Sequence, residues 1–469
     1  MKKQIWNHAM YLNRKAIVAD DGRTLSYSEL DDCSNKLSCH LIARRLVFCL
    51  CTNGIGSLLG YYSFLKTGIV PVMLDASKDM ELMNRLLAIY KPSYIWLPTS
   101  VYSPEYGKIE YSVFNYTLTS YSNDPIELHS ELAVLLTTSG STGSPKLVRL
   151  SYDNIRSNAE SIAEYLNITA DERPVTSLPM YYSYGLSVIN SHLLKGATIL
   201  LTDKPVIQKE FWTFVKEQRA TSIAGVPYTY EMLKRLRIFR MDLPELKTMT
   251  QAGGKLNADL AKEYMEQAAA SGKKFIVMYG QTEATARMSY LPFDRALEKY
   301  SSIGIAIPGG SFLLIDERGD EIEDVNKDGE LVYTGANVSL GYAECREDLA
   351  KGDENSGVLY TGDIARRDED GFYYITGRMK RFVKIYGNRV NLDATEQLVK
   401  DITTSCACVG VDDKITVFTT EQGKEEEIKS LLMKKTGLNV RAFAVRVIEE
   451  IPKNPSGKVQ YAELSNLLN

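Results

Sequence analysis

The sequence predicts an α/β fold with a large N-terminal domain of layered α/β subdomains plus a β-rich portion, followed by a small α+β C-terminal domain. A length of 469 residues exceeds what one compact core organises and implies two or three structural units. Strand-like apolar runs alternate with helical stretches such as 152–166 and 208–218. This alternation favours a largely parallel sheet.

The predicted strands are short apolar runs bounded by polar or turn-forming residues. They lie at residues 44–52, 69–74, 94–97, 132–138, 197–202, 221–227, 273–280, 311–316 and 329–335. The β-rich portion is expected near 300–377, and a lysine- and glutamate-rich helix at 421–436. After residues 378–381 the remaining chain is short, with predicted strands and helices that alternate as in a small α+β domain. We therefore predict one domain over 1–379 and a second over 380–469.

Charge and hydropathy exclude several classes of protein. The formal net charge is −4 and the sequence pI is near 5.8, which gives no electrostatic case for a nucleic-acid partner. No apolar run approaches the roughly 18 residues that a membrane span needs. The start, "MKKQIWNHAMYLNRK", has no apolar core typical of a secretory signal, so we expect a cytoplasmic protein.

The seven cysteines are odd in number and form no CxxC pair, which indicates free thiols in a reducing compartment. Cys49 with Cys51, and Cys406 with Cys408, stand two residues apart in apolar segments. This spacing predicts buried strand positions rather than metal ligands.

A loop rich in glycine and hydroxyl residues lies between the predicted strand at 132–138 and another at 147–150, ahead of a helix capped at Ser151 or Asp153. It consists of Thr138, Ser139, Gly140, Ser141, Thr142, Gly143, Ser144, Pro145 and Lys146. Backbone N–H groups, short hydroxyl donors and a terminal lysine would suit a phosphate cradle. The segment is not a Walker loop, because proline precedes the lysine and leucine follows it. The alternative is a flexible Gly/Ser turn.

The segment "TTSGSTGSPK" resembles the phosphate-binding signature of the adenylate-forming (AMP-binding) enzymes: acyl- and aryl-CoA synthetases, peptide-synthetase adenylation domains and luciferases. Other segments resemble further signatures of this superfamily, in order along almost the whole chain. They are "LSYSEL" (25–30), "LKTGIVPVMLD" (65–75), "MYGQTEAT" (278–285), "GELVYTGANVSLGY" (329–342), "YTGDIARRDEDGFYYITGR" (360–378) and "NPSGKVQY" (454–461).

The resemblance implies a nucleotide site. It implies that Tyr279 stacks on adenine, that Thr282 contacts the α-phosphate and that Glu283 ligates magnesium, for which a carboxylate is a suitable hard ligand. The chain turns at Gly280 after a strand, where the ligand crevice of an open sheet lies. The remaining residues implied are Asp363 for the ribose diol, Arg378 for ribose and phosphate, and Gly253 with Gly254 beside the base and substrate.

The C-terminal domain would supply the catalytic lysine, Lys458, which the resemblance places on the substrate carboxylate and the α-phosphate. A lone lysine near a chain end is ordinarily a solvated surface residue, but Pro455 and Gly457 fix a turn just before this one. The resemblance also implies that the domain is mobile, with its hinge at Lys380 and a thiol channel passing Gly387. Arg381 would add positive charge near the thiol entrance, favouring a CoA phosphate or an acidic carrier protein.

The acyl pocket is predicted at Tyr182, Tyr184 and Gly253, with Tyr182 at the position of the family's aromatic or histidine gate. No aspartate occurs between Asp171 and Asp203, which disfavours an α-amino acid because a buried ammonium needs a carboxylate partner. Tyrosines at a helix start are equally well explained as core residues, and that alternative stays open.

The predicted function is ATP-dependent activation of a small non-amino carboxylic acid as an acyl-adenylate, with release of pyrophosphate, then transfer to a thiol. The expected cofactors are ATP and Mg²⁺, with CoA or phosphopantetheine as acceptor, and an acyl carrier protein is a further candidate partner. Two alternatives remain: a stand-alone amino-acid adenylation enzyme that loads a carrier protein, and a catalytically silent nucleotide-binding scaffold. A P-loop kinase or ATPase is disfavoured by the Pro-Lys loop.

Overall fold

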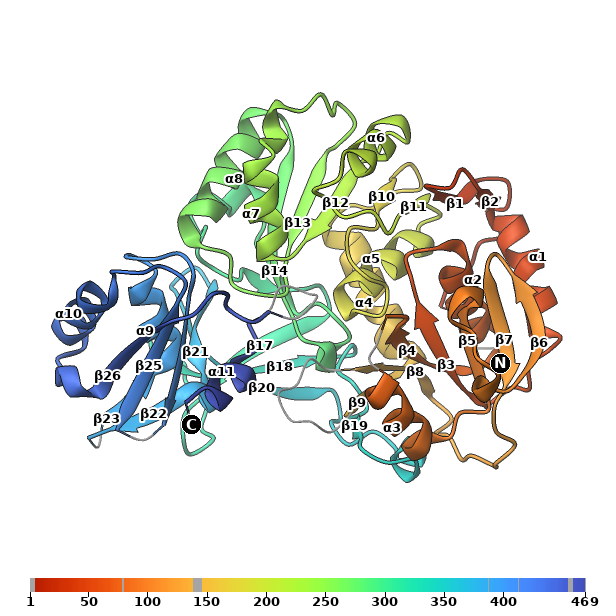
Figure 1. The fold of residues 1–469 in the computed structure, drawn as a ribbon. Helices are drawn as coiled ribbons and strands as arrows, with labels where there is room; N and C mark the ends of the chain where they lie inside the picture. The colour runs from red at the N-terminus through yellow and green to blue at the C-terminus, as the bar shows by residue number, and fades with distance from the viewer. Residues whose placement is uncertain are drawn as a thin grey trace.

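The structure, a computed structural model, describes residues 5–77, 80–137, 146–386, 388–411, 413–453 and 459–468. Figure 1 shows two large sheets flanked by helices, a third sheet between them and the C-terminal segment, and the C-terminal segment itself in blue. Within these residues, none of the helices has the length and apolar character needed to cross a bilayer.

The first large sheet has the strand order β19-β9-β8-β4-β3-β5-β7-β6. Its centre is parallel (β8, β4, β3, β5), and antiparallel strands extend both edges. The strands are β3 (Leu46–Cys51), β4 (Val70–Asp75), β5 (Tyr94–Pro98), β6 (Lys108–Val113), β7 (Tyr116–Ser120), β8 (Leu132–Thr137), β9 (Leu147–Ser151) and β19 (Tyr342–Ala343).

The second large sheet has the order β16-β15-β14-β13-β12-β10-β11-β1-β2 and is parallel from β14 to β1. The strands are β1 (Lys15–Ala19), β2 (Thr24–Ser26), β10 (Pro174–Val175), β11 (Ile199–Leu201), β12 (Ser222–Gly225), β13 (Thr248–Gln251), β14 (Lys274–Tyr279), β15 (Ser289–Tyr290) and β16 (Ile305–Ala306).

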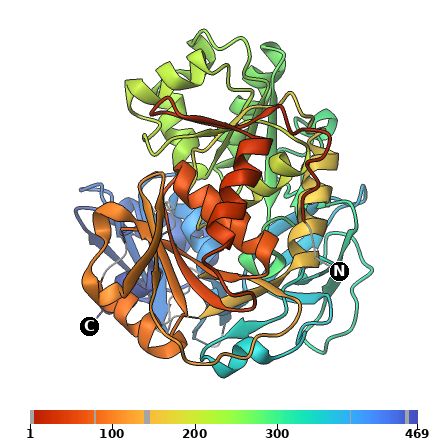
Figure 2. The ribbon, with the colours of Figure 1, turned by 90° about the vertical axis from the view of Figure 1, so that its right-hand side faces the viewer.

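Helices fill the space between the two sheets and cover their outer faces. One hydrophobic cluster joins α1, α2, α4 and α5 to strands of both sheets, and Figure 2 shows α1 and α2, in red, between them. Helices α6, α7 and α8 cover the outer face of the second sheet, and α3 that of the first. The helices are α1 (Tyr27–Ser38), α2 (Ile55–Thr67), α3 (Met80–Tyr90), α4 (Tyr152–Tyr165), α5 (Ser183–Leu194), α6 (Lys209–Glu217), α7 (Pro227–Arg235) and α8 (Ala258–Ala270).

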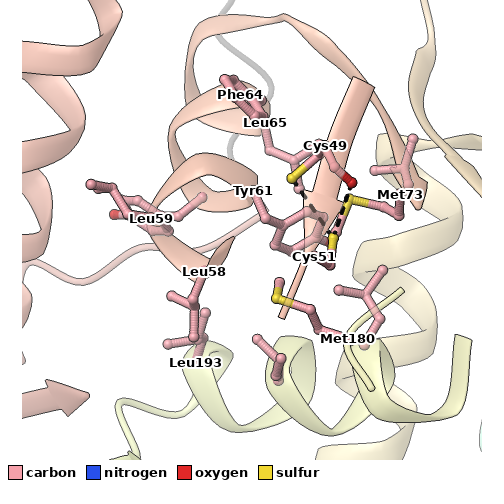
Figure 3. Close-up of a cluster of buried hydrophobic side chains, with 14 of the residues drawn as sticks. Cys49, Cys51, Leu58, Leu59, Tyr61, Phe64, Leu65, Met73, Met180 and Leu193 are labelled. Atoms are coloured by element: carbon pink, nitrogen blue, oxygen red, sulfur yellow. Dashed lines mark hydrogen bonds between the residues drawn. The ribbon is translucent and has the colours of Figure 1, made fainter. Parts of the chain in front are cut away.

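Alternate side chains of strand β3 pack on opposite faces of the first sheet. Every residue of β3 is buried, and successive side chains point to opposite faces. Leu46, Phe48 and Leu50 face α3, whereas Val47, Cys49 and Cys51 face the inner layer. Figure 3 shows both cysteines among side chains of α2, β4 and α5. Cys49 and Cys51 lie in β3 and Cys406 and Cys408 in β24 (Cys406–Val411), all four buried, so the strand interpretation of these pairs is confirmed; all seven cysteines are free thiols.

The β-rich portion is an antiparallel sheet of order β17-β18-β20-β21, as the sequence predicts. Its strands are β17 (Gly310–Ile315), β18 (Gly329–Gly335), β20 (Val358–Arg367) and β21 (Tyr373–Arg378). A bulge between β20 and β21 falls next to Asp363, where Asp363 pairs with Arg378.

The C-terminal segment has its own hydrophobic clusters on the two faces of the sheet β24-β25-β26. Cys406 and Cys408 of β24 face α9 and α10, and Ala407 and Val409 face α11. The elements are β22 (Phe382–Ile385), β23 (Asn388–Asn391), α9 (Leu392–Val399), β24 (Cys406–Val411), β25 (Lys414–Thr419), α10 (Glu425–Thr436), β26 (Phe443–Val447) and α11 (Tyr461–Asn466). The predicted fold class, α/β with a small α+β C-terminal part, is confirmed.

Candidate active site

The candidate site lies along the carboxyl ends of four neighbouring parallel strands, β10, β12, β13 and β14. Tyr182 follows β10 at the start of α5, Val226 follows β12, Gly253 follows β13 and Glu283 follows β14. Carboxyl ends of parallel strands form the usual ligand crevice of an open α/β sheet. Thr282 and Glu283, predicted from "MYGQTEAT", therefore meet the predicted Gly253 at one edge of the sheet.

A tight turn presents Thr282 and Glu283, which form the short helix η4 (Thr282–Ala284). A Cβ on Gly280 would lie 1.8 Å from the carbonyl oxygen of Ala286, so only glycine fits at this crossing. Thr285 adopts a φ of +65°, and Ala286 N–H donates to the Ala284 carbonyl across it. Such a γ-turn is strained by about 1–3 kcal/mol for a β-branched residue, and strain of this size concentrates at functional sites.

Asp363 is the centre of a buried hydrogen-bond network, with 4% of its side chain exposed. Tyr279 Oη donates to Oδ2 over 2.5 Å, Gln281 Nε2 donates to the same oxygen over 3.1 Å, and Arg378 Nε donates to Oδ1 over 3.0 Å. Burial and this carboxylate raise the pKa of Tyr279. A carboxylate has about four acceptor positions, so Asp363, with three of them occupied, can accept about one further hydrogen bond from a hydroxyl of a ligand diol.

Glu283 and Lys146 are connected through a single aromatic ring. Tyr342 Oη donates to Glu283 Oε1 over 2.7 Å, and Lys146 Nζ lies 3.6 Å from the centre of the Tyr342 ring. Lys146 Nζ also forms an ion pair with Glu344 at 3.3 Å. Within the described residues, no three His, Cys, Asp or Glu side chains gather as metal ligands. A single carboxylate suits Mg²⁺, which keeps several waters and binds largely through substrate phosphates.

Thr282 and Gly253 contact the start of α5. Thr282 Oγ1 lies 3.1 Å from Ser183 Oγ, the first residue of that helix. Gly253 has a φ of +82°, and a Cβ there would lie 2.6 Å from Tyr182 Oη. The Cβ position of Gly254 is 3.2 Å from Pro227 Cγ. Backbone and tyrosine are thus in close contact where the acyl pocket is predicted.

Tyr184 and Tyr181 occupy different environments from Tyr182. Tyr184 is buried, and its hydroxyl donates to the carbonyl and the hydroxyl oxygens of Thr250 over 2.7 and 2.9 Å. Tyr181 packs against the cluster between the two sheets. Of the three tyrosines, Tyr182 is the one in contact with Gly253, whereas Tyr184 has the contacts of a core residue.

Arg381, which the sequence analysis expects to add positive charge near the thiol entrance, is paired with acidic residues. Its guanidinium donates to Asp393 Oδ1 over 2.5 Å, lies 3.3 Å from Glu396 Oε2 and stacks on Tyr461 at 3.5 Å. The charge that the sequence assigned to the thiol entrance is therefore paired within the C-terminal segment. Lys380 lies in the short helix η7 (Met379–Arg381), directly after Arg378.

Several predicted residues lie outside the described part of the chain. They are Thr138, Ser139, Gly140, Ser141, Thr142, Gly143, Gly387 and Lys458. The strands on either side of 138–145 pair antiparallel, with Thr137 opposite Leu147, so Lys146 is placed by β9.

Sequence reasoning missed two residues that organise the site. Tyr342 ends the segment "GELVYTGANVSLGY", but nothing in that segment indicates its contact with Glu283, 59 residues earlier. Arg149 in β9 donates to the carbonyls of Leu340 and Tyr342 and to Glu354, and so fixes the strand that holds Tyr342. The sequence did contain one indication of this role, because Arg149 is a charged residue between the apolar residues Val148 and Leu150 of the strand.

A family model described as "AMP-binding enzyme" matches residues 5–343. Among curated proteins, a feruloyl-CoA synthase of Amycolatopsis sp. is 27% identical over 71% of this chain and 69% of its own length. A 2-succinylbenzoate–CoA ligase of Bacillus cytotoxicus is 26% identical, over 93% of this chain and 91% of its own.

Solved structures share the same fold over nearly the whole chain. The o-succinylbenzoate CoA synthetase of Bacillus subtilis, in complex with its acyl-adenylate intermediate, superposes with a TM-score of 0.79. The sequences are 20% identical, and the match covers 96% of this chain and 95% of that one.

Proposed function

Because this chain belongs to the family of AMP-binding enzymes, we propose that it is an acid–thiol ligase acting on a small carboxylic acid that is not an α-amino acid. The enzyme activates the acid with ATP as an acyl-adenylate, releases pyrophosphate and transfers the acyl group to a thiol. CoA is the acceptor that the relatives' names support, because the similar curated proteins reported above are named as a CoA synthase and a CoA ligase.

One observation carries the proposal: groups suited to the ribose and to the phosphates of ATP gather near the carboxyl end of β14. Asp363 with Tyr279 and Arg378 provides an acceptor for the ribose. Glu283 and Lys146 both contact Tyr342, the first at its hydroxyl and the second at its ring. A scaffold that only binds a nucleotide has no need of a strained turn that presents Thr282 and Glu283.

The residues fit ATP and its magnesium ion by their donor chemistry. Glu283 offers a hard oxygen ligand, the buried Asp363 offers oxygen acceptors, and Lys146 offers a cation for phosphate oxygens. Magnesium bound with ATP neutralises part of the negative charge on the phosphates. The site residues of this chain position the nucleotide and hold its charge.

The first step is an in-line displacement. A carboxylate oxygen of the acid attacks the α-phosphorus of ATP, the bond to the β-phosphate oxygen breaks and pyrophosphate leaves. The work of the protein is positioning and electrostatic stabilisation. We assign Thr282 to the α-phosphate, Lys146 to the outer phosphates and Lys458 to the carboxylate and α-phosphate, where a cation offsets the charge of the transition state.

In the second step the thiol sulfur attacks the acyl carbonyl, the thiol proton is lost and AMP leaves. We propose that residues 380–469 form a domain that rotates about Lys380 for this step, with the thiol arm passing Gly387. The contact between Asn391 Nδ2 and the Thr376 carbonyl, at 3.2 Å, belongs to the arrangement described here and would have to break.

Residues at the start of α5 indicate the class of acid that the enzyme activates. Tyr182 and Gly253 define a site with a phenol hydroxyl, and no aspartate is present between 171 and 203 to pair an ammonium. This favours a non-amino acid over the amino-acid adenylation alternative. We place the enzyme in the cytoplasm, where ATP and CoA are both available, and a carrier protein remains the alternative acceptor.

The test is a product analysis with ATP, Mg²⁺, CoA and a panel of acids. The proposal predicts equal amounts of AMP, pyrophosphate and acyl-CoA, each dependent on the acid. Release of ADP and phosphate would identify a different phosphotransfer reaction. Adenylate formation without acyl-CoA, captured with hydroxylamine, would support the carrier-protein acceptor.

A further inference from the structure

Arg287 is a buried arginine four residues after Glu283, with 2% of its surface exposed. Its backbone is firmly held, because the Arg287 carbonyl accepts hydrogen bonds from Asn158 Nδ2 over 3.0 Å and from Asn337 Nδ2 over 2.9 Å. The same Asn337 amide also binds the Ala284 carbonyl of the turn that presents Glu283. The position of Arg287 is therefore coupled to the candidate active site.

The guanidinium of Arg287 has no carboxylate partner among the described residues. It makes no ion pair and no side-chain hydrogen bond in that part of the chain, and Nε is fully buried without an acceptor. One face of the guanidinium stacks on the Tyr184 ring at 3.7 Å. Taking a charge out of water without a partner costs several kcal/mol, so buried arginines are normally paired.

Arg149 provides the comparison within the same molecule. It is equally buried, but its guanidinium donates to the carbonyls of Leu340, Tyr342, Lys351 and Gly352 and pairs with Glu354. A structural arginine in this fold thus has all its nitrogens occupied. Arg287 lacks such partners, which indicates that its partner arrives from outside the chain.

Arg287 lies beside the predicted acyl site, because its guanidinium stacks on the Tyr184 ring and the centre of that ring lies 6.4 Å from the centre of the Tyr182 ring. Burial raises the pKa of Tyr182 to about 12, and the positive charge of Arg287 opposes this rise. The positive charge of Arg287 likewise opposes the rise in the pKa of Tyr165 and Tyr184. The Tyr165 ring stacks on the Tyr290 ring, with 4.3 Å between their centres. Tyr182 in turn contacts Gly253. A bound acid next to Tyr182 would therefore lie within reach of a cation framed by aromatic rings.

We infer that Arg287 binds a second carboxylate of the acyl substrate, so that the acid activated by this enzyme is a dicarboxylic acid. This inference rests on the proposed ligase function. One carboxylate reacts with ATP beside Thr282, and the distal carboxylate pairs with the guanidinium, whose planar fork suits a two-pronged contact with carboxylate oxygens. The tyrosine rings pack against the carbon skeleton that joins the two groups.

Selectivity follows from this pairing. A monocarboxylic acid with a methyl group in place of the distal carboxylate would leave the buried cation unpaired, and it would lose a charge-assisted contact as well. Sites built to bind a polar group reject analogues without it by factors of up to about 10⁴. We expect kcat/KM to favour the diacid of each matched pair at least about 100-fold.

Acid-dependent ATP–pyrophosphate exchange on matched pairs tests the inference. Suitable pairs are succinate with butyrate, glutarate with valerate, and terephthalate with 4-methylbenzoate. The wild-type chain should exchange with at least one diacid and discriminate against its monoacid partner. Arg287→Met keeps the length of the apolar stem and should reverse this preference while retaining exchange with the monoacid. Arg156→Met, at an exposed position of α4, should leave the preference unchanged.

Equal activity of the wild type on both members of every pair, or preference for the monoacids, would overturn the assignment of Arg287 while leaving the ligase function intact. An equal loss of exchange with both acids in a folded Arg287→Met protein would show that Arg287 serves the reacting carboxylate or the phosphates instead. Absence of exchange with every acid would overturn the ligase function itself.

The wild-type comparison does not depend on any variant. If Arg287→Met fails to fold, Arg287→Lys retains the charge but not the fork, and a drop in diacid preference of about tenfold is the expected result. An unchanged preference in that variant would contradict a two-pronged contact.

Discussion

Tyr342 Oη lies 2.7 Å from Glu283 Oε1 and donates a hydrogen bond to it, while the Tyr342 ring lies 3.6 Å from Lys146 Nζ. One side chain thus contacts both the proposed magnesium ligand and the last residue of the proposed phosphate loop. Arg149 fixes this tyrosine by donating to its carbonyl over 3.0 Å. Three segments distant in sequence are held together by these contacts, and the proposed chemistry depends on that arrangement.

Tyr342→Phe should raise the Mg²⁺ concentration needed for half-maximal exchange and lower kcat about tenfold. The ring under Lys146 remains, but the carboxylate loses a charge-assisted hydrogen bond, typically about 1.5–3 kcal/mol. Exchange measured against Mg²⁺ concentration checks this. Tyr374→Phe removes a comparable hydroxyl, bound to Asp368 over 2.9 Å, and should leave the Mg²⁺ dependence unchanged. Equal effects in both variants would refute a role for Tyr342.

Asp363→Asn should raise KM for ATP about 10- to 100-fold with little change in KM for the acid. The amide keeps the shape of the side chain but loses the charge that pairs with Arg378, and it competes with Tyr279 and Gln281 as a donor. Initial rates with varied ATP at saturating acid give the result. Asp370→Asn, at an exposed position, is the control, and a change in acid KM alone would argue against a nucleotide role.

Gly253→Ala should change KM for the acid several-fold more than KM for ATP. The added Cβ would lie 2.6 Å from Tyr182 Oη and must displace that ring. Gly272→Ala has a similar positive φ, +66°, with nothing within 4 Å, so it isolates the backbone strain from the contact. Gly253→Ala should lower the melting temperature more than Gly272→Ala, because it adds the contact with Tyr182 to a similar backbone strain. If Gly272→Ala alters acid KM as strongly, Tyr182 does not line the acyl site.

His192 should make stability depend on pH. Burial lowers its pKa to about 4 from an ordinary 6.5. Between pH 6.5 and about pH 4, His192 is protonated in the unfolded chain but neutral in the folded chain. The free energy of unfolding therefore falls as the pH falls through this window. The total is up to about 3 kcal/mol.

Urea unfolding of the wild type and His192→Gln between pH 7 and pH 4 measures this dependence. The free energy of unfolding of the variant should depend less steeply on pH, with a slope that corresponds to about one proton fewer taken up on unfolding. His40→Gln, which changes an exposed histidine, should match the wild type. Parallel curves for the wild type and His192→Gln would show that His192 does not contribute.

The predictable parts of the fold are those where one segment determines its own structure. Residues 69–74 and 132–136 are buried on both faces, which gives continuous apolar strands, and they form most of β4 and β8. Ser151 caps α4 reciprocally with Asn154, as the sequence suggested. Strand β13 was missed because its sequence, "TMTQ", has no apolar run; β12 and β14 on either side define it.

In the site, the sequence indicated which residues follow the strands, because short motifs place Tyr279, Thr282 and Glu283 by local geometry. It could not indicate partners brought in by tertiary contacts. Tyr342 reaches Glu283 only because β19 pairs with β9, and Arg381 is neutralised only because α9 brings Asp393 beside it. Arg287 stood next to a recognised motif, but its lack of an acidic partner is visible only in three dimensions.

The most direct test of the account is ATP–pyrophosphate exchange dependent on a non-amino carboxylic acid, in the wild type and in Glu283→Ala, Lys458→Ala and Glu369→Ala. Glu369 lies exposed in the turn between β20 and β21 and is the matched control. We expect robust exchange in the wild type and in Glu369→Ala, and a loss of at least about 100-fold in Glu283→Ala and Lys458→Ala. Exchange that survives both substitutions, or that requires an α-amino acid, would contradict it.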